Sequence, residues 1–457
     1  MYNKANSLNL VWQILVGREK MLIEFSFSNY LSFKDKVTLS MIASNDDTLP
    51  QNVVKNAQGT DLNLLKSAVI YGANASGKSN FIKAMTFMKY FVEKSYMTLD
   101  KDTSINSSPF KLDQAYFQKP SEFEVVFLRE GIRYIYGFKI DKKNVLQEWF
   151  YHYPKGQQSL LFERTSNTGD IKRDYKFGNS FKGGKKSLAE KTKRNSLFIS
   201  VAAQFNHEIA DIVVSWFSEY FKVVDYDHPL IKEQHSTIEK AVSNEESKNR
   251  IVEFLKVSDT GIEDISIDYE KLDDGIKVSD FLQNCDNSTE VIIGQRVHHS
   301  PNILKISILH KGKNAGGESS LIPLKLGEES AGTKKLFDIS ETWINSIDSG
   351  SLMIVDEFDL RLHPLLSENL VNMFNSDSIN KNNAQLIITT HNSDLLDKNI
   401  FRRDQVWFTE KSRETGSSSL YSIWDFKKNK ARKTENLRKN YLAGRYGAVP
   451  ILSRFED

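Results

Sequence analysis

The residues best suited to chemistry form one glycine-containing segment at Gly72–Ser79. It reads Gly-Ala-Asn-Ala-Ser-Gly-Lys-Ser and matches the G-x-x-x-x-G-K-[ST] pattern in full. Glycines let backbone N–H groups turn inward around phosphate oxygens, and the following helix directs its positive end toward them. The lysine would reach the β- and γ-phosphates, and the serine hydroxyl would bind Mg²⁺. The alternative is a plain Gly/Ser turn. The pattern predicts that the following residues bind a nucleotide: Gly72, Asn74, Ala75, Ser76, Gly77, Lys78, Ser79 and Asn80.

A pair of adjacent carboxylates follows a short hydrophobic segment in the last third of the chain. Leu352–Val355 reads as a buried strand, and Asp356 and Glu357 come directly after it. Burying a charge without a partner is costly, so acids at this position indicate a task. Beside a phosphate loop, Asp356 would help to hold Mg²⁺, and Glu357 could be the general base that polarises the attacking water. Many strands end in acidic residues, so the pair is informative only together with the phosphate loop.

Two further segments could complete such a site. His391 follows the apolar stretch Gln385–Thr389, and ligands of parallel sheets lie at the carboxyl ends of strands. It could contact the γ-phosphate or the attacking water, although a lone histidine is more often a structural hydrogen-bonding group. Ser330 and Gly332 stand at the predicted start of a helix. They form either an ordinary N-cap or an anion-binding helix start that completes the nucleotide site of another subunit.

The elements that would position these residues alternate between strands and helices at both ends of the chain. An apolar strand at Leu64–Tyr71 leads into the phosphate loop, and a helix is predicted to follow until about Ser95. Strands and helices alternate again after residue 352, which predicts a parallel sheet covered on both faces. The middle of the chain predicts an antiparallel meander (122–153), exposed loops (154–194) and a helical stretch (197–222). Residues 229–250 are predicted to form a solvated arm or a partner-facing segment, and strands are predicted at 262–269 and 303–309.

The phosphate loop and the acidic pair lie far apart in sequence, so one domain is predicted to be split by an inserted lobe. The expected fold class is α/β, with an antiparallel β lobe near the N-terminus. The predicted parts are an N-terminal extension (1–20), the first half of the nucleotide-binding domain (21–200), an inserted helical lobe (201–300) and the second half of that domain (301–457).

The composition is that of a folded protein without membrane spans. The 457 residues are 40% hydrophobic and 26% charged, with a formal net charge of +2. No run approaches the ~18 consecutive apolar residues that span a bilayer, and no signal peptide is expected. The single cysteine, Cys285, cannot form an intrachain disulfide, which favours a reducing, cytoplasmic setting.

The order of these motifs resembles the ABC/SMC-like ATPase head. The nearest resemblance is to the AAA-labelled, OLD-related ATPases of prokaryotic phage-defence and abortive-infection modules, and it covers most of residues 21–450. Besides the phosphate loop, the segments that carry it are Phe27–Phe33, Asp356–Phe358 with Leu362–Pro364, Arg402–Phe408 and Gly444–Pro450.

The resemblance implies a P-loop NTPase head of the ABC type, split by an insertion, with ATP and Mg²⁺ sandwiched between two heads. Lys78 and Ser79 of one head would face Ser330 and Gly332 of the other, and Asp359 would lie in the loop at the dimer interface. The signature reads Ser-Ala-Gly-Thr rather than Leu-Ser-Gly-Gly-Gln, and Gln147 is a weak candidate for the glutamine that links the inserted lobe to Mg²⁺.

The resemblance further implies an ATP-hydrolysing sensor or regulatory subunit of a defence module, acting as a homodimer or larger homo-oligomer. The chain has no sustained heptads, which disfavours a chromosome-organising or DNA-repair ATPase. The segment after His391 is too short for a nuclease domain, so the effector is expected to be a separate protein. One alternative is a nucleotide-gated oligomeric scaffold with little turnover, and another is a DNA-binding repair ATPase. Basic runs at 182–194 and 427–445 are either solvated faces or contacts to nucleic acid.

Overall fold

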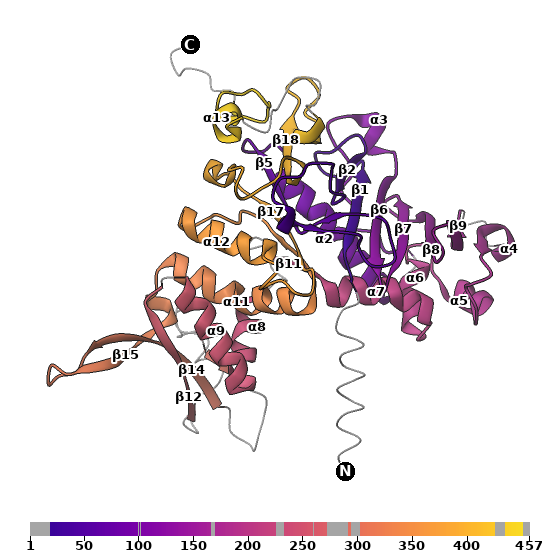
Figure 1. Ribbon diagram of the computed structural model, residues 1–457. Coiled ribbons are helices and arrows are strands. Elements are labelled where there is room, and N and C mark those ends of the chain that lie inside the picture. Colours follow the sequence, from indigo (N-terminus) through magenta and orange to yellow (C-terminus); the bar gives the residue numbers. More distant parts are fainter. Residues whose placement is uncertain are drawn as a thin grey trace. The chain divides into compact units, whose positions relative to one another are not determined.

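The computed structural model describes residues 19–98, 100, 102–165, 170–224, 233–258, 260–271, 291–293, 302–425 and 435–450. The chain divides into two compact units (Figure 1). The first comprises Met1–Tyr226, Ser346–Leu360 and Ser367–Asp457, and the second comprises Asp227–Asn345 and Arg361–Leu366. The second unit overlaps the inserted lobe that the sequence predicted at 201–300, with bounds at 227 and 345 and the short segment Arg361–Leu366 added. Among the described residues, no helix is both long enough and apolar enough to cross a membrane.

A six-stranded sheet forms the centre of the first unit. Five of its strands are parallel to their neighbours, and the last is an antiparallel edge. In spatial order they are β11 (Phe221–Val224), β16 (Leu352–Val355), β17 (Gln385–Thr389), β5 (Ser67–Gly72), β18 (Val406–Lys411) and β19 (Ser418–Ser422). Each residue of β5, β16 and β17 is buried, as the continuous apolar runs predict for a sheet covered on both faces.

An antiparallel seven-stranded sheet forms the β lobe of the same unit. Its order is β10 (Tyr175–Phe177), β9 (Ser159–Arg164), β8 (Val145–Tyr153), β7 (Ile132–Ile140), β6 (Ser121–Arg129), β1 (Leu22–Ser28) and β2 (Val37–Ser40). The prediction of exposed loops over 154–194 is wrong, because this range contains β9, β10, α4 (Ile171–Asp174) and α5 (Lys185–Lys191). The short apolar stretch Leu160–Phe162 and the isolated Phe181 gave little signal for these elements, although Leu161, Phe162 and Phe181 are buried.

Helix α2 (Lys78–Lys94) joins the two sheets. It follows β5 directly through the phosphate loop and lies against the β lobe (Figure 1). The Phe81 ring meets that of Phe25 edge-on at 5.8 Å between centroids, and the Phe87 and Phe123 rings lie 5.0 Å apart. Two helices, α6 (Phe198–Gln204) and α7 (Glu208–Tyr220), form the predicted helical stretch, and they are separated at Asn206, which adopts a left-handed φ of 56°. The β lobe and α2 therefore hold the phosphate loop from one side.

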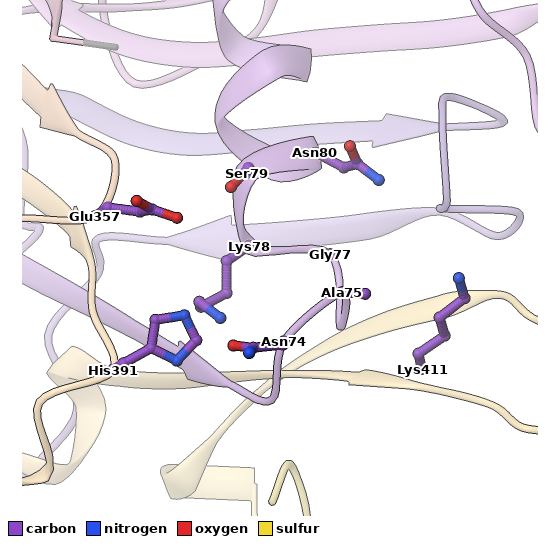
Figure 2. A pocket seen from close by; sticks show the side chains of 9 residues that line it. All are labelled: Asn74, Ala75, Gly77, Lys78, Ser79, Asn80, Glu357, His391 and Lys411. Carbon is purple, nitrogen blue, oxygen red and sulfur yellow. The ribbon is translucent and has the colours of Figure 1, made fainter. Parts of the chain in front are cut away.

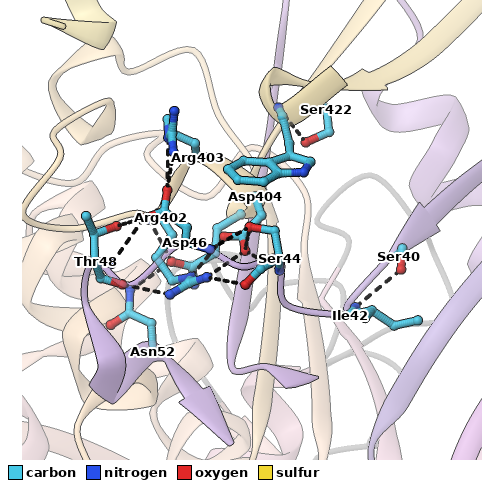
Figure 3. Close-up of polar contacts among 12 residues, drawn as sticks. Ser40, Ile42, Ser44, Asp46, Thr48, Asn52, Arg402, Arg403, Asp404 and Ser422 are labelled. Atoms are coloured by element: carbon cyan, nitrogen blue, oxygen red, sulfur yellow. Dashed lines mark hydrogen bonds and ion pairs between the residues drawn. The ribbon is translucent and has the colours of Figure 1, made fainter. Parts of the chain in front are cut away.

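A buried polar cluster fixes the start of β18 (Figure 3). The Arg402 guanidinium donates to both carboxylate oxygens of Asp404, at 2.9 and 2.8 Å, and to the Thr48 carbonyl at 2.7 Å. Asp404 in turn accepts from the Ser44 backbone N–H at 2.7 Å. Gln405 donates to the Ser67 carbonyl at 3.0 Å. These bonds tie the loop after β2 and the strand β5 to β18.

Short elements complete the first unit. They are η1 (Pro50–Asn52), β3 (Val53–Val54), β4 (Leu64–Leu65), η2 (Ser95–Met97), α3 (Gln114–Phe117), most of α12 (Pro364–Asn375), η4 (Ser393–Leu395), η5 (Arg403–Gln405) and α13 (Leu437–Leu442).

The second unit combines helices with a small antiparallel sheet. Its elements are α8 (Glu233–Ser243), α9 (Glu245–Val257), β12 (Ile262–Lys271), β13 (Val291–Ile293), β14 (Asn302–Lys313), β15 (Ser319–Lys325), η3 (Leu326–Glu328) and most of α11 (Ala331–Ser349). Residues 233–250, within the range where the sequence predicted a solvated arm or a partner-facing segment, form α8 and the start of α9. Ile238 and Ala241, three residues apart, are both buried, so one side of α8 belongs to the core. Cys285 and residues 1–18 lie outside the described residues.

Candidate functional site

The carboxyl ends of four parallel strands meet at one edge of the six-stranded sheet. β5 runs into the phosphate loop, β16 into Asp356 and Glu357, β17 into Thr390 and His391, and β18 ends at Lys411. A cavity of about 490 Å³ opens at this edge (Figure 2). It is lined by Asn74, Ala75, Gly77, Lys78, Ser79, Asn80, Glu357, His391 and Lys411.

The phosphate loop depends on close packing that only glycine permits. Gly77 has a φ of 124°, and a Cβ placed there would lie 2.7 Å from the Ser418 hydroxyl. The preceding loop residue Ala75 also adopts a left-handed φ, of 59°. Ser76 shares a hydrogen bond of 2.7 Å with the Thr409 hydroxyl of β18. Contacts to β18 and β19 therefore hold the phosphate loop in shape, in addition to the backbone conformation of its glycines.

Lys78 is the buried cation of the cavity. Its Nζ donates to the Gly72 carbonyl at 2.9 Å and to the Ala73 carbonyl at 3.2 Å. Burial lowers its pKa to about 8, against the opposing charges of Asp356, Glu357 and Asp359. A phosphate brought to this side chain would stabilise the ammonium form, since opposite charges raise the pKa of a lysine.

The two acids after β16 have different surroundings. Asp356 is buried, and its Oδ1 accepts from the Thr389 hydroxyl and from the Glu357 backbone N–H at 3.2 Å. The Glu357 N–H also donates to the Thr389 hydroxyl oxygen at 2.9 Å. Glu357 itself has a left-handed φ of 47°, and the turn directs its carboxylate into the cavity toward Ser79 (Figure 2). Thr389 thus positions both acids, a role that the sequence did not predict.

His391 lies beside Lys78 in the same cavity (Figure 2). Burial lowers its pKa, and the nearby Lys78 charge lowers it further, while the carboxylates of Asp359, Glu357 and Asp356 oppose the shift. The ring is therefore neutral at pH 7. The Asp359 carboxylate accepts from the His391 backbone N–H at 3.3 Å and from the Thr390 hydroxyl, so Asp359 holds the histidine loop within the chain.

Ser330 and Gly332 belong to the second unit and are not among the residues that line the cavity. The Ser330 hydroxyl accepts from the Thr333 backbone N–H at 3.1 Å and caps α11. A Cβ on Gly332 would lie 2.7 Å from the Arg361 carbonyl oxygen, so this position too requires glycine.

Two sequence expectations at the site need correction or addition. Gln147 lines a different cavity, together with Lys139 and Arg194, and is not among the residues around the phosphate loop. Lys411, which also lines the cavity, was not among the residues predicted from the sequence. Like His391, it stands at the carboxyl end of a strand that is parallel to β5. The rule that ligands lie at the carboxyl ends of strands could have found it.

Comparison with known proteins assigns the chain to a family. Residues 67–397 match the family described as "AAA domain, putative AbiEii toxin, Type IV TA system". The chain belongs to this family. The matched range starts at β5 and ends beyond His391, so it includes every residue that lines the cavity except Lys411. The resemblance to ABC/SMC-like AAA ATPases and the predicted fold class are confirmed.

Solved structures are similar only at low identity. The SMC head domain from Thermotoga maritima aligns with a TM-score of 0.37 and 14% identity, covering 88% of this chain and 98% of that one. The recombination mediator protein RecF bound to ATP, from the RecFOR pathway, aligns with a TM-score of 0.33 and 14% identity, again covering 88% and 98%. Both superpositions are loose, and the family assignment rests on the sequence match. No curated protein matches the chain.

Proposed function

We propose that the protein binds and hydrolyses ATP in the cavity at the phosphate loop. The observation that carries this proposal is that Lys78, Ser79, Glu357 and His391, from three strands, line one cavity. The phosphate loop binds the β- and γ-phosphates through its backbone N–H groups and Lys78. Glu357 takes the proton of the attacking water, and neutral His391 donates a hydrogen bond to the γ-phosphate.

The residues present fit a magnesium ion. Mg²⁺ prefers oxygen ligands and keeps several waters and phosphate oxygens. The Ser79 hydroxyl and the Asp356 carboxylate are of this kind. Among the described residues the hydrogen bonds to the Asp356 carboxylate engage Oδ1, and Oδ2 is left for a ligand. When bound, the ion neutralises charge on the phosphates. Thr389 holds the Asp356 carboxylate and the Glu357 backbone in place for this purpose.

We propose further that a complete site needs two copies of the chain. The Ser330 hydroxyl caps the 19-residue helix α11, and Gly332 in its first turn makes room for the Arg361 carbonyl. Such a helix start suits the γ-phosphate held by the partner. Nucleotide would thus close a homodimer or a larger assembly, and hydrolysis would reopen it.

The biological role that these properties support is a cytoplasmic sensor or regulatory subunit of an anti-phage defence module, which controls a separate nuclease or toxin. The family description, with its reference to a type IV toxin–antitoxin system, supports this direction over DNA repair. Five of the basic residues in the run at 427–445 lie outside the described residues.

The test is steady-state phosphate release by the wild type, Lys78→Ala and Glu357→Gln, with solution mass measured with and without ATP. We expect loss of nucleotide binding in Lys78→Ala. We expect loss of turnover with retained, ATP-stabilised assembly in Glu357→Gln, because binding survives while the base is gone. Normal turnover in Glu357→Gln would refute the assigned base, and normal turnover in Lys78→Ala would refute the site. ATP-dependent assembly of the wild type without phosphate release would instead favour a nucleotide-gated scaffold.

A further inference from the structure

Lys411 ends β18 and lines the cavity on the side of β5 away from β16 and β17. Adjacent strands are spaced about 4.8 Å apart. Across the carboxyl edge of the sheet, the chain therefore presents Glu357, His391, the phosphate loop and Lys411 in succession. Figure 2 shows the Lys411 side chain beside Ala75, with Glu357 and His391 on the far side of the loop.

The backbone of Lys411 is fixed against the phosphate loop. Lys411 pairs with Ser418 across the β18–β19 hairpin. The Ser418 N–H donates to the Ser32 carbonyl at 2.7 Å, and the hydroxyls of the same two residues are hydrogen-bonded at 2.8 Å. Asn80, at the start of α2, donates to the Ser32 hydroxyl at 2.8 Å. The close contact between Gly77 and Ser418 adds to this packing. The hairpin thus cannot move from the loop without breaking these contacts.

The side chain of Lys411 is exposed and uncommitted. Within the part of the chain that the structure describes, no carboxylate lies within ion-pair distance of its ammonium, and no hydrogen bond fixes it. Lys78, in contrast, is buried and bonded to loop carbonyls. The phosphate loop is therefore flanked by two cations, of which one is free to turn toward a ligand.

We propose that Lys411 is a nucleotide-binding residue that contacts the α-phosphate of ADP and ATP. The inference rests on the proposed function, which places the γ-phosphate beside Glu357 and His391. From there the phosphate chain leads across β5 toward β18, where Lys411 stands. An ammonium that donates to a phosphate oxygen forms a strong, charge-assisted hydrogen bond. A contact to the α-phosphate strengthens the binding of di- and triphosphates alike and leaves the chemical step unchanged.

The experiment compares Lys411→Ala, Lys411→Arg and the control Lys381→Ala. Lys381 is also exposed but lies in the turn before β17, at the opposite edge of the sheet. Dissociation constants for MgADP and MgATP are measured by calorimetry, and kcat and KM by phosphate release. We expect Lys411→Ala to weaken both nucleotides by the same factor, about tenfold, the usual size of one lost hydrogen bond to a charged group. Its kcat should stay within about twofold, and Lys411→Arg should restore affinity.

The outcomes separate this inference from the proposed function. Normal nucleotide binding by the wild type with unchanged affinity in Lys411→Ala overturns the inference alone. A loss for MgATP without a loss for MgADP places the contact at the γ-phosphate and also overturns it. A wild type that binds neither nucleotide overturns the proposed function and this inference with it. If Lys381→Ala weakens nucleotide binding as much as Lys411→Ala does, the effect comes from the change in net charge, and the inference about Lys411 is overturned.

Discussion

Nucleotide binding should take up a proton at Lys78. The burial that lowers the pKa of Lys78 to about 8 leaves the side chain about half protonated at pH 8. Phosphates placed beside it raise its pKa well above 9, because they favour the charged form. The expected uptake per bound nucleotide is then about 0.1 proton at pH 7, about 0.5 at pH 8 and about 0.9 at pH 9.

The same linkage sets the affinity. Only the protonated form of Lys78 binds well, so the dissociation constant should rise about tenfold between pH 7 and pH 9. Other groups of the site contribute little in this range. His391, whose pKa is lowered, is already neutral, and phosphates with a second pKa near 6 are already ionised.

The assay is calorimetric titration with MgADP at pH 8 in buffers of different ionisation enthalpy, where the slope gives the number of protons. Lys78→Arg is the matched control, because its guanidinium stays charged at every pH of the experiment. Whatever affinity this variant retains should not change with pH. Zero proton uptake at pH 8 together with a constant affinity from pH 7 to pH 9 would refute the reasoning.

Two further predictions concern stability. Burial raises the pKa of Asp338 in α11 to about 7, and its buried Oδ1 has no hydrogen-bond partner among the described residues. In the unfolded chain Asp338 loses its proton near pH 4, so the stability of the native state falls as the pH rises from about 4 to about 7. Asp338→Asn should therefore stabilise the protein by about 1–3 kcal/mol at pH 8 but not at pH 4. Thermal melts at the two pH values measure this difference. Arg402→Ala leaves the buried Asp404 carboxylate without its ion pair and should lower the free energy of unfolding by about 3–5 kcal/mol in denaturant unfolding. Adding Asp404→Leu to Arg402→Ala should recover part of this loss. If the losses of the two single variants simply add in the double variant, the energetic coupling of this pair is contradicted.

The parts of the site that are continuous in sequence could be predicted from it. The phosphate loop lies where the G-x-x-x-x-G-K-S pattern places it, and Asp356 and His391 follow buried strands as their apolar runs indicated. Continuous apolar runs are reliable signals because a strand buried on both faces has no room for polar side chains.

The parts that depend on contacts between distant segments could not be predicted. Nothing in the local sequence of Thr389 or Asp359 shows that these residues hold Glu357 and the histidine loop, because the bonds join residues about 30 positions apart. The strand end at Lys411 could have been predicted from its apolar run, but its place against the phosphate loop could not. Its partner Ser418 and the contacts of Ser418 to Ser32 become visible only once the hairpin is placed against α2. Strand β9 was missed because its apolar stretch, Leu160–Phe162, is only three residues long and follows a polar, glycine-containing segment.

The position of β5 in the middle of its sheet has a consequence for synthesis on the ribosome. Gln405 contacts Ser67 across 338 positions, and both neighbours of β5 are contributed by the last fifth of the chain. A nascent polypeptide must therefore keep the mainly apolar strand Ser67–Gly72 with two open edges until residues 385–411 have been synthesised. Such edges invite misassembly. Products that end before β17 would lack both neighbours of β5, and efficient production is expected to depend on chaperones that shield this strand during synthesis.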